Sequence, residues 1–126
     1  MPKKHVATKH APTPIGPYSQ GVIAGGLLFV SGQIPIDPST EKLVEGDITV
    51  QTEQVLKNVL AVLKEAKMGP ENVVKATVFL ADLTDFPQMN DVYGKYLGKE
   101  PPARSTIQAA ALPRGVKIEI DVIAAF

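Results

Sequence analysis

The chain has 126 residues, 44% of them hydrophobic, so we expect a single domain, residues 1–126, with a substantial core. Thirteen lysines and arginines balance thirteen aspartates and glutamates, which leaves no net charge to attract nucleic acid or an anionic membrane. The absence of cysteine excludes disulfides, a thiol nucleophile and thiolate metal ligands.

The N-terminal segment predicts neither export nor membrane insertion. Its basic start, Met1 to His5, is not followed by an apolar signal core, and no run approaches ~18 apolar residues. His5 and His10 lack the spacing of a metal site, so no metal is expected. We therefore expect a soluble, cytoplasmic protein with no membrane partner.

The first half of the chain predicts a hairpin, a loop and a helix. Two apolar runs, 18–24 and 27–33, flank a Gly-Gly pair, which is typical of a β-hairpin. The Asp-Pro-Ser-Thr content of residues 36–46 indicates a loop. Asp47 can cap a helix whose apolar residues keep helical spacing, and Gly69-Pro70 would end it.

A strand and a second helix follow. The strand, residues 73–81, is apolar on both faces, with Val74, Ala76, Val78 and Leu80 on one and Val73, Thr77, Phe79 and Ala81 on the other. Thr84 or Asp85 can cap the helix, which has Pro87 in its first turn and Phe86, Met89, Tyr93, Tyr96 and Leu97 at helical spacing.

The last two runs, 103–111 and 116–123, predict an antiparallel hairpin. Leu112-Pro113-Arg114-Gly115 between them has the residue preferences of a type I turn. The polar faces of the two runs would then coincide, with Gln108 opposite Glu119 and Arg104 roughly 13 Å further along.

The predicted order β-β-α-β-α-β-β defines an α+β fold, a mixed sheet with two helices on one face. Two helices cannot cover both faces of the doubly apolar strand 73–81. The pattern therefore predicts that the chain oligomerises through the other face of the sheet.

Arg104 and Glu119 are the sharpest functional candidates, because a purely structural strand would carry Thr or Val at such positions. The pair could bracket a small molecule, or one of them could meet its partner across a subunit interface. The alternative is that both lie on a solvated sheet face.

Five segments in this order closely resemble the RidA family, also called the YjgF family, of enamine/imine deaminases, and the resemblance extends from Ala7 to Phe126. These segments are Ile15-Gly16-Pro17-Tyr18-Ser19-Gln20, Ser31-Gly32-Gln33-Ile34-Pro35, Asp85-Phe86-Pro87-Gln88-Met89-Asn90, Pro102-Ala103-Arg104-Ser105 and Ile118-Glu119-Ile120. The resemblance implies a chorismate-mutase-like fold and a homotrimer with a central β-barrel and pockets at the subunit interfaces. Some eukaryotic relatives are mitochondrial, so that compartment stays open.

The same resemblance implies a substrate and a set of site residues. Members hydrolyse 2-aminoacrylate and 2-aminocrotonate, or their 2-imino acid tautomers, to 2-oxo acids and ammonia. By similarity the pocket residues are Tyr18, Ser31, Gly32, Asn90, Arg104, Thr106 and Glu119. Many members carry Cys at the position of Thr106, so its contribution by side chain or by backbone is left open.

The residue types fit that chemistry. The guanidinium of Arg104 can bind a substrate carboxylate in fork geometry, and Glu119 can exchange protons with the attacking water. A protonated imine is itself electrophilic, so no cofactor is expected. Two other functions remain: a ribonuclease or translation inhibitor, which the balanced charge disfavours, and a non-catalytic binder of small carboxylates.

Overall fold

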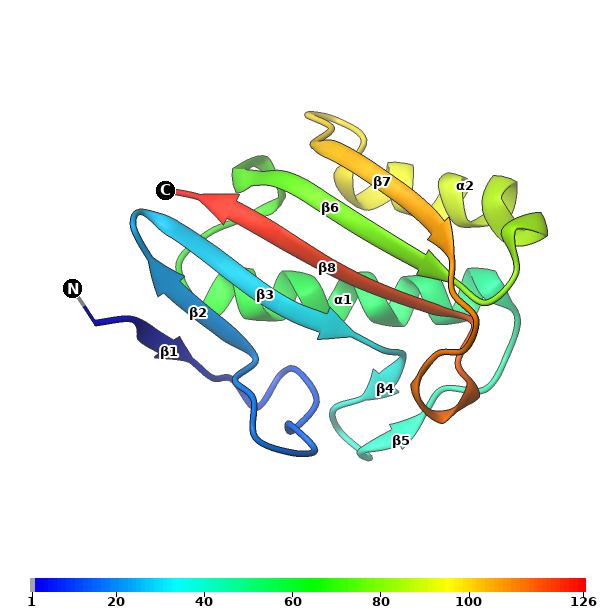
Figure 1. The fold of residues 1–126 in the computed structure, drawn as a ribbon, viewed down its shortest axis with the longest axis horizontal. Coiled ribbons are helices and arrows are strands. Elements are labelled where there is room, and N and C mark those ends of the chain that lie inside the picture. Colours follow the sequence, from blue (N-terminus) through cyan, green and yellow to red (C-terminus); the bar gives the residue numbers. More distant parts are fainter. Residues whose placement is uncertain (1) are drawn as a thin grey trace.

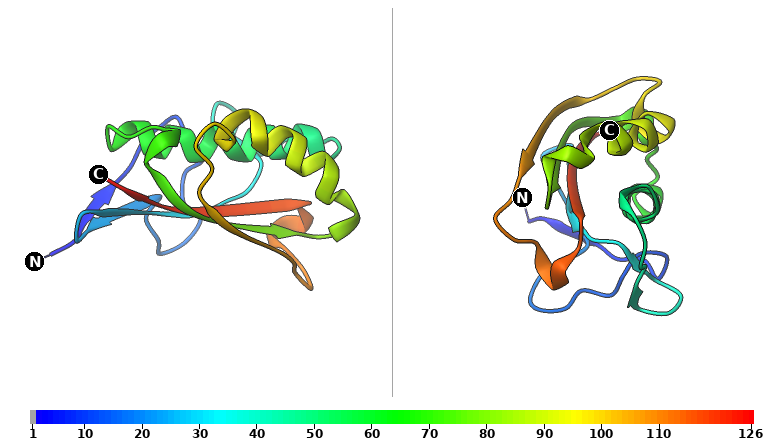
Figure 2. Two further views of the ribbon diagram at one scale, coloured as in Figure 1. Left: turned by 90° about the horizontal axis from the view of Figure 1, so that it is seen from above. Right: turned by 90° about the vertical axis from the view of Figure 1, so that its right-hand side faces the viewer.

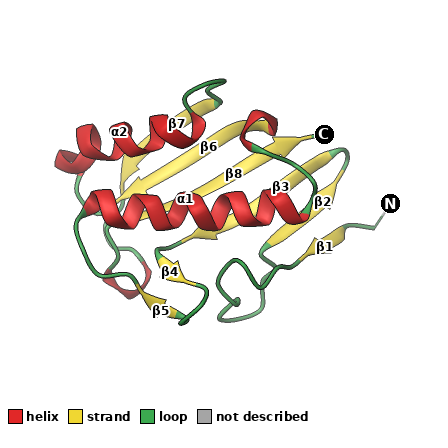
Figure 3. Ribbon diagram, turned by 180° about the vertical axis from the view of Figure 1, so that it is seen from behind, coloured by secondary structure: helices red, strands yellow, loops and turns green. Residues whose placement is uncertain are grey.

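Six strands form one mixed sheet in the order β1-β2-β3-β8-β6-β7, and both helices lie on one of its faces (Figure 1, Figure 3). The computed structural model describes residues 2–126, so Met1 of the predicted domain lies outside the described residues. The sheet consists of β1 (Lys4–Val6), β2 (Gly21–Ala24), β3 (Leu27–Gln33), β6 (Val73–Leu80), β7 (Ala103–Gln108) and β8 (Ile118–Ala125). The helices are α1 (Ile48–Glu65) and α2 (Phe86–Leu97), and β4 (Ile36–Asp37) pairs with β5 (Lys42–Leu43) apart from the main sheet. The α+β prediction, with two helices on one face, is confirmed.

The hydrophobic core lies between the helices and the sheet, and the opposite face of the sheet is left open (Figure 2). Side chains of α1 supply much of this core; Val55, Leu56, Val59, Val62 and Leu63 are at most 1% exposed. Burying each such side chain stabilises the fold by about 1.5–3 kcal/mol. Among the described residues no helix is both long and apolar enough to cross a membrane.

The helix boundaries follow local capping chemistry. Asp47 caps α1 as predicted, because its Oδ1 accepts the Val50 N–H at 3.0 Å. The helix ends before Gly69, because Lys67 adopts a left-handed φ of 60° and the Met68 N–H donates to the Leu63 carbonyl. Neither predicted cap serves α2 by its side chain; a 3₁₀ turn precedes the helix, and Asp82 caps that turn.

Two strand predictions need correction near their ends. β2 begins at Gly21, so residues 18–20 form a loop and not a strand, and the predicted loop 36–46 holds the short pair β4 and β5. In β6 an irregularity between Val73 and Lys75 interrupts the pairing with β8. Val73 is therefore buried, Val74 is 48% exposed, and the assignment of Val74 to the face of Ala76 is wrong.

The predicted hairpin between the last two strands does not form, because β6 lies between them (Figure 1). β7 pairs with β6 in parallel, and β8 pairs with the other edge of β6 antiparallel. The intervening turn is closed by the Gly115 N–H and the Leu112 carbonyl at 3.1 Å, but Arg114 has a φ of 57°, which excludes type I. Strand β8, with a fully buried apolar face, thus occupies the centre of the sheet, and the polar β7 lies at its edge.

Candidate active site

A cavity of about 470 Å³ lies beside several of the predicted site residues. It lies where the loop 12–18, the end of β3, the turn at 113–114 and the start of β8 meet. Four of the predicted residues line it: Tyr18, Ser31, Gly32 and Glu119. Because these residues come from segments far apart in the sequence, the sheet itself assembles this cluster, which we call the carboxylate cluster.

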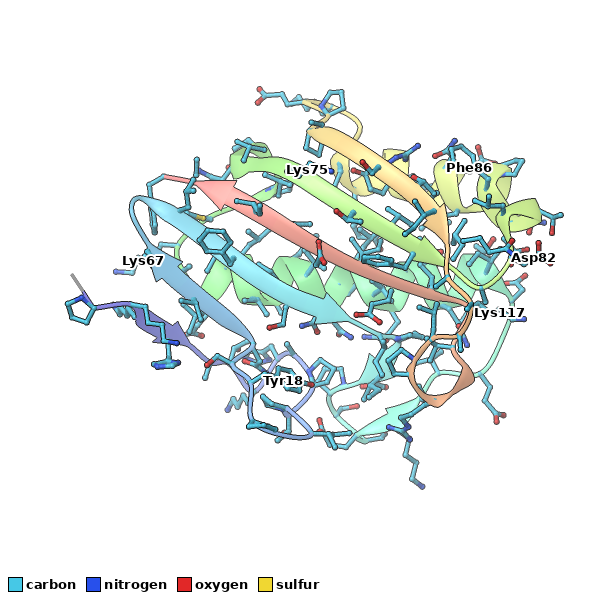
Figure 4. All side chains as sticks on the ribbon, viewed as in Figure 1. Tyr18, Lys67, Lys75, Asp82, Phe86 and Lys117 are labelled. Atoms are coloured by element: carbon cyan, nitrogen blue, oxygen red, sulfur yellow. The ribbon has the colours of Figure 1, made fainter. Side chains whose placement is uncertain are left out.

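Ser31 holds the loop that carries Tyr18. Its hydroxyl donates to the Ser19 carbonyl at 2.5 Å, and its N–H donates to the Gln20 carbonyl at 2.9 Å. The Tyr18 hydroxyl accepts the Ile15 N–H at 3.3 Å, and the side chain is 50% exposed. Tyr18, which Figure 4 labels, therefore forms a wall of the cavity and is not packed into the core. Ser31 holds the backbone that follows Tyr18.

Glu119 is half-buried on the open face of the sheet, with its carboxylate against the backbone of Gly32. Burial raises the pKa of this carboxyl, and the charge of Asp121 raises it further. The neighbour of Glu119 that the sequence predicted is wrong. Phe79, and not Gln108, lies opposite Glu119.

Gln108 has a different function. Its Oε1 accepts the Leu83 N–H at 2.9 Å, so it supports the turn that leads into α2. The sequence placed Gln108 opposite Glu119 because it predicted a hairpin between the last two strands, and that hairpin does not form.

The other predicted site residues form a second cluster on β7 and α2, which we call the arginine cluster. Arg104 and Asn90 line an open hollow of about 460 Å³ together with Tyr93. The Arg104 guanidinium carbon lies 4.7 Å from the centre of the Tyr93 ring and 5.4 Å from that of Phe86. Thr106 lies two residues along β7, and its Oγ1 is buried without a hydrogen-bond partner.

The two clusters occupy opposite faces of the sheet. Arg104 pairs with Ala76 of β6, and Glu119 pairs with Phe79 of the same strand. Since residues three apart along a strand point to opposite sides, Arg104 faces the helices and Glu119 the open side. The expectation that their polar faces coincide is wrong. Figure 4 shows that Tyr18 and Phe86, one from each cluster, also lie far apart across the sheet.

Three contributors to these clusters were not identified from the sequence. Arg114 lines the cavity of the carboxylate cluster, and Phe86 and Tyr93 contact Arg104. The two aromatic residues are seven positions apart, which places them on one face of α2, but that spacing equally fits a core stripe. For Arg114 the sequence offered only its position in the predicted turn, which does not by itself indicate a site residue.

Metal-binding side chains do not gather in the described part of the chain. Among residues 2–126 no three His, Cys, Asp or Glu side chains are close enough together to hold an ion.

The chain matches known proteins over nearly its whole length. A family model described as Endoribonuclease L-PSP covers residues 8–126. A RutC family protein of Pyrococcus horikoshii is 50% identical over 122 residues, which are 97% of this chain and 97% of that protein. Reactive Intermediate Deaminase A, chloroplastic, of Arabidopsis thaliana is 48% identical over 122 residues, which are 97% of this chain and 65% of that protein.

The fold agrees with these matches. The crystal structure of E. coli TdcF with bound serine superposes with a TM-score of 0.93 at 40% identity and covers 98% of both chains. The sequence motifs, the mixed sheet with its two helices and these matches together define the class: the chain belongs to the Endoribonuclease L-PSP family, the RidA (YjgF) family.

Proposed function

We propose that this protein is a hydrolytic deaminase of reactive enamines and imines, a 2-iminobutanoate/2-iminopropanoate deaminase. Its substrates would be 2-aminoacrylate, 2-aminocrotonate and their 2-imino acid tautomers, and its products 2-oxo acids and ammonia. The observation that carries this proposal is the half-buried Glu119 with a raised pKa in a cavity of about 470 Å³. The name of the Arabidopsis relative, a reactive intermediate deaminase, supports the same reaction class.

We further propose that the active site forms between subunits of a homotrimer whose open sheet faces build a central barrel. In one chain Arg104 and Glu119 face opposite sides of the sheet, so a single subunit does not bring them to the same ligand. A second copy would place its arginine cluster beside the carboxylate cluster of the first. The exposed apolar residues Phe29 and Ile107 support burial of this part of the sheet in an assembly.

In the proposed reaction Arg104 binds the substrate carboxylate through two parallel N–H donors. Water attacks the imine carbon, and Glu119 takes a proton from that water as the new C–O bond forms. The nitrogen of the resulting tetrahedral carbinolamine takes this proton from Glu119. The C–N bond then breaks and ammonia leaves as the C=O bond of the 2-oxo acid forms, and the hydroxyl proton passes to the Glu119 carboxylate. A carboxyl with a raised pKa suits these proton transfers near neutral pH.

The remaining residues would shape the ligand pocket. Tyr18 would form its wall, Gly32 would allow the carboxylate of Glu119 to lie close to the backbone, and Asn90 and Thr106 would complete the arginine side. The bound serine of E. coli TdcF is a small amino acid with a carboxylate, which supports a pocket of this size and polarity.

A non-catalytic binder of small carboxylates is the second candidate, because it would use the same Arg104. Ribonuclease activity, which the family description carries, finds less support, because the net charge is zero.

Ammonia release separates these functions. A purified dehydratase would generate 2-aminocrotonate from threonine, and ammonia would be followed with and without this protein. We expect the protein to accelerate release. If ammonia release stays at the spontaneous rate while 2-oxobutanoate still binds, the protein is a binder and not a deaminase.

A further inference from the structure

Two aromatic rings of α2 surround the guanidinium of Arg104. The Tyr93 ring is 4.7 Å and the Phe86 ring 5.4 Å from the guanidinium carbon, both within the range of a cation–π contact. Arg104 itself belongs to the edge strand β7, whose outer edge carries no partner strand in the described chain. The guanidinium at the end of the long arginine side chain therefore rests against side chains of α2.

The rings contact the guanidinium through their faces. A ring face attracts the cation but accepts none of its N–H groups in strong hydrogen bonds, so these two face contacts do not use up the guanidinium donors. Arg104 also lines the open hollow of the arginine cluster, where a ligand carboxylate could reach those donors. This arrangement holds the guanidinium and leaves its binding edge open to a ligand.

The two rings differ in how firmly they are held. Tyr93 is 6% exposed, and its hydroxyl is buried without a hydrogen-bond partner. Burial raises its pKa despite the opposing charge of Arg104, so this hydroxyl is neutral and the ring stays a good partner for the cation. Phe86 is half-buried in the first turn of α2. Tyr93 is thus the rigid support and Phe86 the outer one.

We propose that Phe86 and Tyr93 are positioning residues that hold the Arg104 guanidinium in the orientation needed to bind a small 2-oxo or 2-imino carboxylate. This inference rests on the proposed function, in which Arg104 binds the substrate carboxylate. It assigns to α2 a direct part in ligand affinity, in addition to its part in the core. Loss of a ring would let the guanidinium sample other rotamers and weaken binding.

The test uses 2-oxobutanoate as a ligand that needs no turnover. Its dissociation constant is measured by calorimetry for the parent and for Tyr93→Leu, Tyr93→Phe, Phe86→Leu and Phe86→Tyr. We expect each leucine variant to bind about tenfold more weakly, and each variant that keeps a ring to stay within about twofold of the parent. The matched control is Tyr96→Leu, which removes a ring from the next turn of the same helix, away from Arg104.

A double-mutant cycle distinguishes positioning from general damage to the fold. In an Arg104→Ala background, Phe86→Leu should change the residual kcat/KM for ammonia release by less than about twofold, because its effect passes through Arg104. An equal loss in both backgrounds would overturn the proposal. Because Phe86 is only half-buried, its variants keep the test valid if Tyr93→Leu fails to fold.

The possible outcomes distinguish the positioning role of the rings from the deaminase activity. If the parent binds 2-oxobutanoate and the leucine variants bind it equally well, the positioning role is wrong and the deaminase proposal is untouched. If the parent binds 2-oxobutanoate but releases no ammonia, the deaminase proposal is wrong while the ring variants still report on Arg104. A parent that does not bind 2-oxobutanoate would overturn the inference.

Discussion

Gly32 and Glu119 are in such close contact that the glycine cannot carry a side chain without moving the carboxylate. A Cβ atom at Gly32 would overlap Oε2 of Glu119 and lie 2.9 Å from its Cδ. The backbone of Gly32 does not adopt a left-handed φ, so glycine is needed at this position only because a larger residue would collide with Glu119. The glycine of β3 thus determines where the candidate base of β8 rests.

Gly32→Ala should therefore fold and lose activity. The added methyl group meets the far end of a flexible side chain, so the Glu119 carboxylate rotates away at little cost to the fold. We expect the kcat for ammonia release to fall about tenfold or more, with thermal unfolding close to that of the parent. Gly69→Ala is a matched control, since its Cβ would also meet a carboxylate, that of Glu71, away from both clusters. Full activity of Gly32→Ala would show that ammonia release does not depend on the position of the Glu119 carboxylate against Gly32.

Arg104→Lys should lose most activity while the protein stays folded. A lysine ammonium can contact the same rings, but as a point charge it cannot bind a carboxylate through two parallel donors. The kcat/KM for ammonia release measures the loss. Arg114→Lys is the informative comparison, because Arg114 lines the cavity of Glu119 in the same chain. A larger loss in Arg114→Lys would transfer the carboxylate-binding role to Arg114.

Subunit mixing tests whether Arg104 and Glu119 act across an interface. Light scattering at micromolar concentration should give the mass of a trimer. Arg104→Ala and Glu119→Gln chains, each nearly inactive alone, are unfolded together and refolded as an equal mixture. Random assembly makes about a quarter of the interfaces carry both native residues, so we expect about a quarter of the parent's activity. A monomer, or a mixture that stays as inactive as either variant, would contradict the shared site.

Glu119→Gln should slow ammonia release without changing assembly or 2-oxobutanoate binding. The amide keeps the shape of the side chain, but it cannot accept a proton from water. Single-turnover rates report the chemical step, and calorimetry reports binding. A variant as fast as the parent would mean that the substrate itself activates the water, and a variant that fails to assemble would point to a structural role.

The same substitution should change how stability depends on pH. The pKa of Glu119 is raised by burial and by Asp121, so its contribution to stability is fully present below its unfolded pKa, about 4.3, and is lost as the pH rises through the folded pKa. A glutamine amide cannot ionise, so the Glu119→Gln variant should gain stability relative to the parent as the pH rises from about 4 to about 7. Urea unfolding at several pH values measures this difference. A difference that shrinks as the pH rises would contradict the shift.

Local periodicity was enough to predict most elements. The helical spacing of Val55, Leu56 and Val59 predicted α1, and the run 116–123 predicted strand β8. The helix cap at Asp47 could also be predicted from the sequence, because a cap depends only on residues three positions apart. The site residues were named from their types and from their resemblance to a known family.

The partners of each strand were decided by the tertiary structure. The connection 109–117 fits both a hairpin and a crossing beneath the end of β6, and a local pattern does not distinguish them. The structure shows the crossing, with the Ala109 N–H donating to the Leu80 carbonyl and the Ala81 N–H to the Lys117 carbonyl.

Burial of β8 explains why the connection crosses beneath β6 and does not form a hairpin. β8 has a wholly apolar face and gains most at the centre of the sheet, whereas β7 turns Arg104, Thr106 and Gln108 toward the helices and is tolerated only at the edge. Two charges close in sequence thereby come to lie on opposite faces of the sheet. Sequence alone thus determined the elements and the chemistry of the candidate residues, while long-range pairing, driven by burial of β8, decided which of them share a cavity.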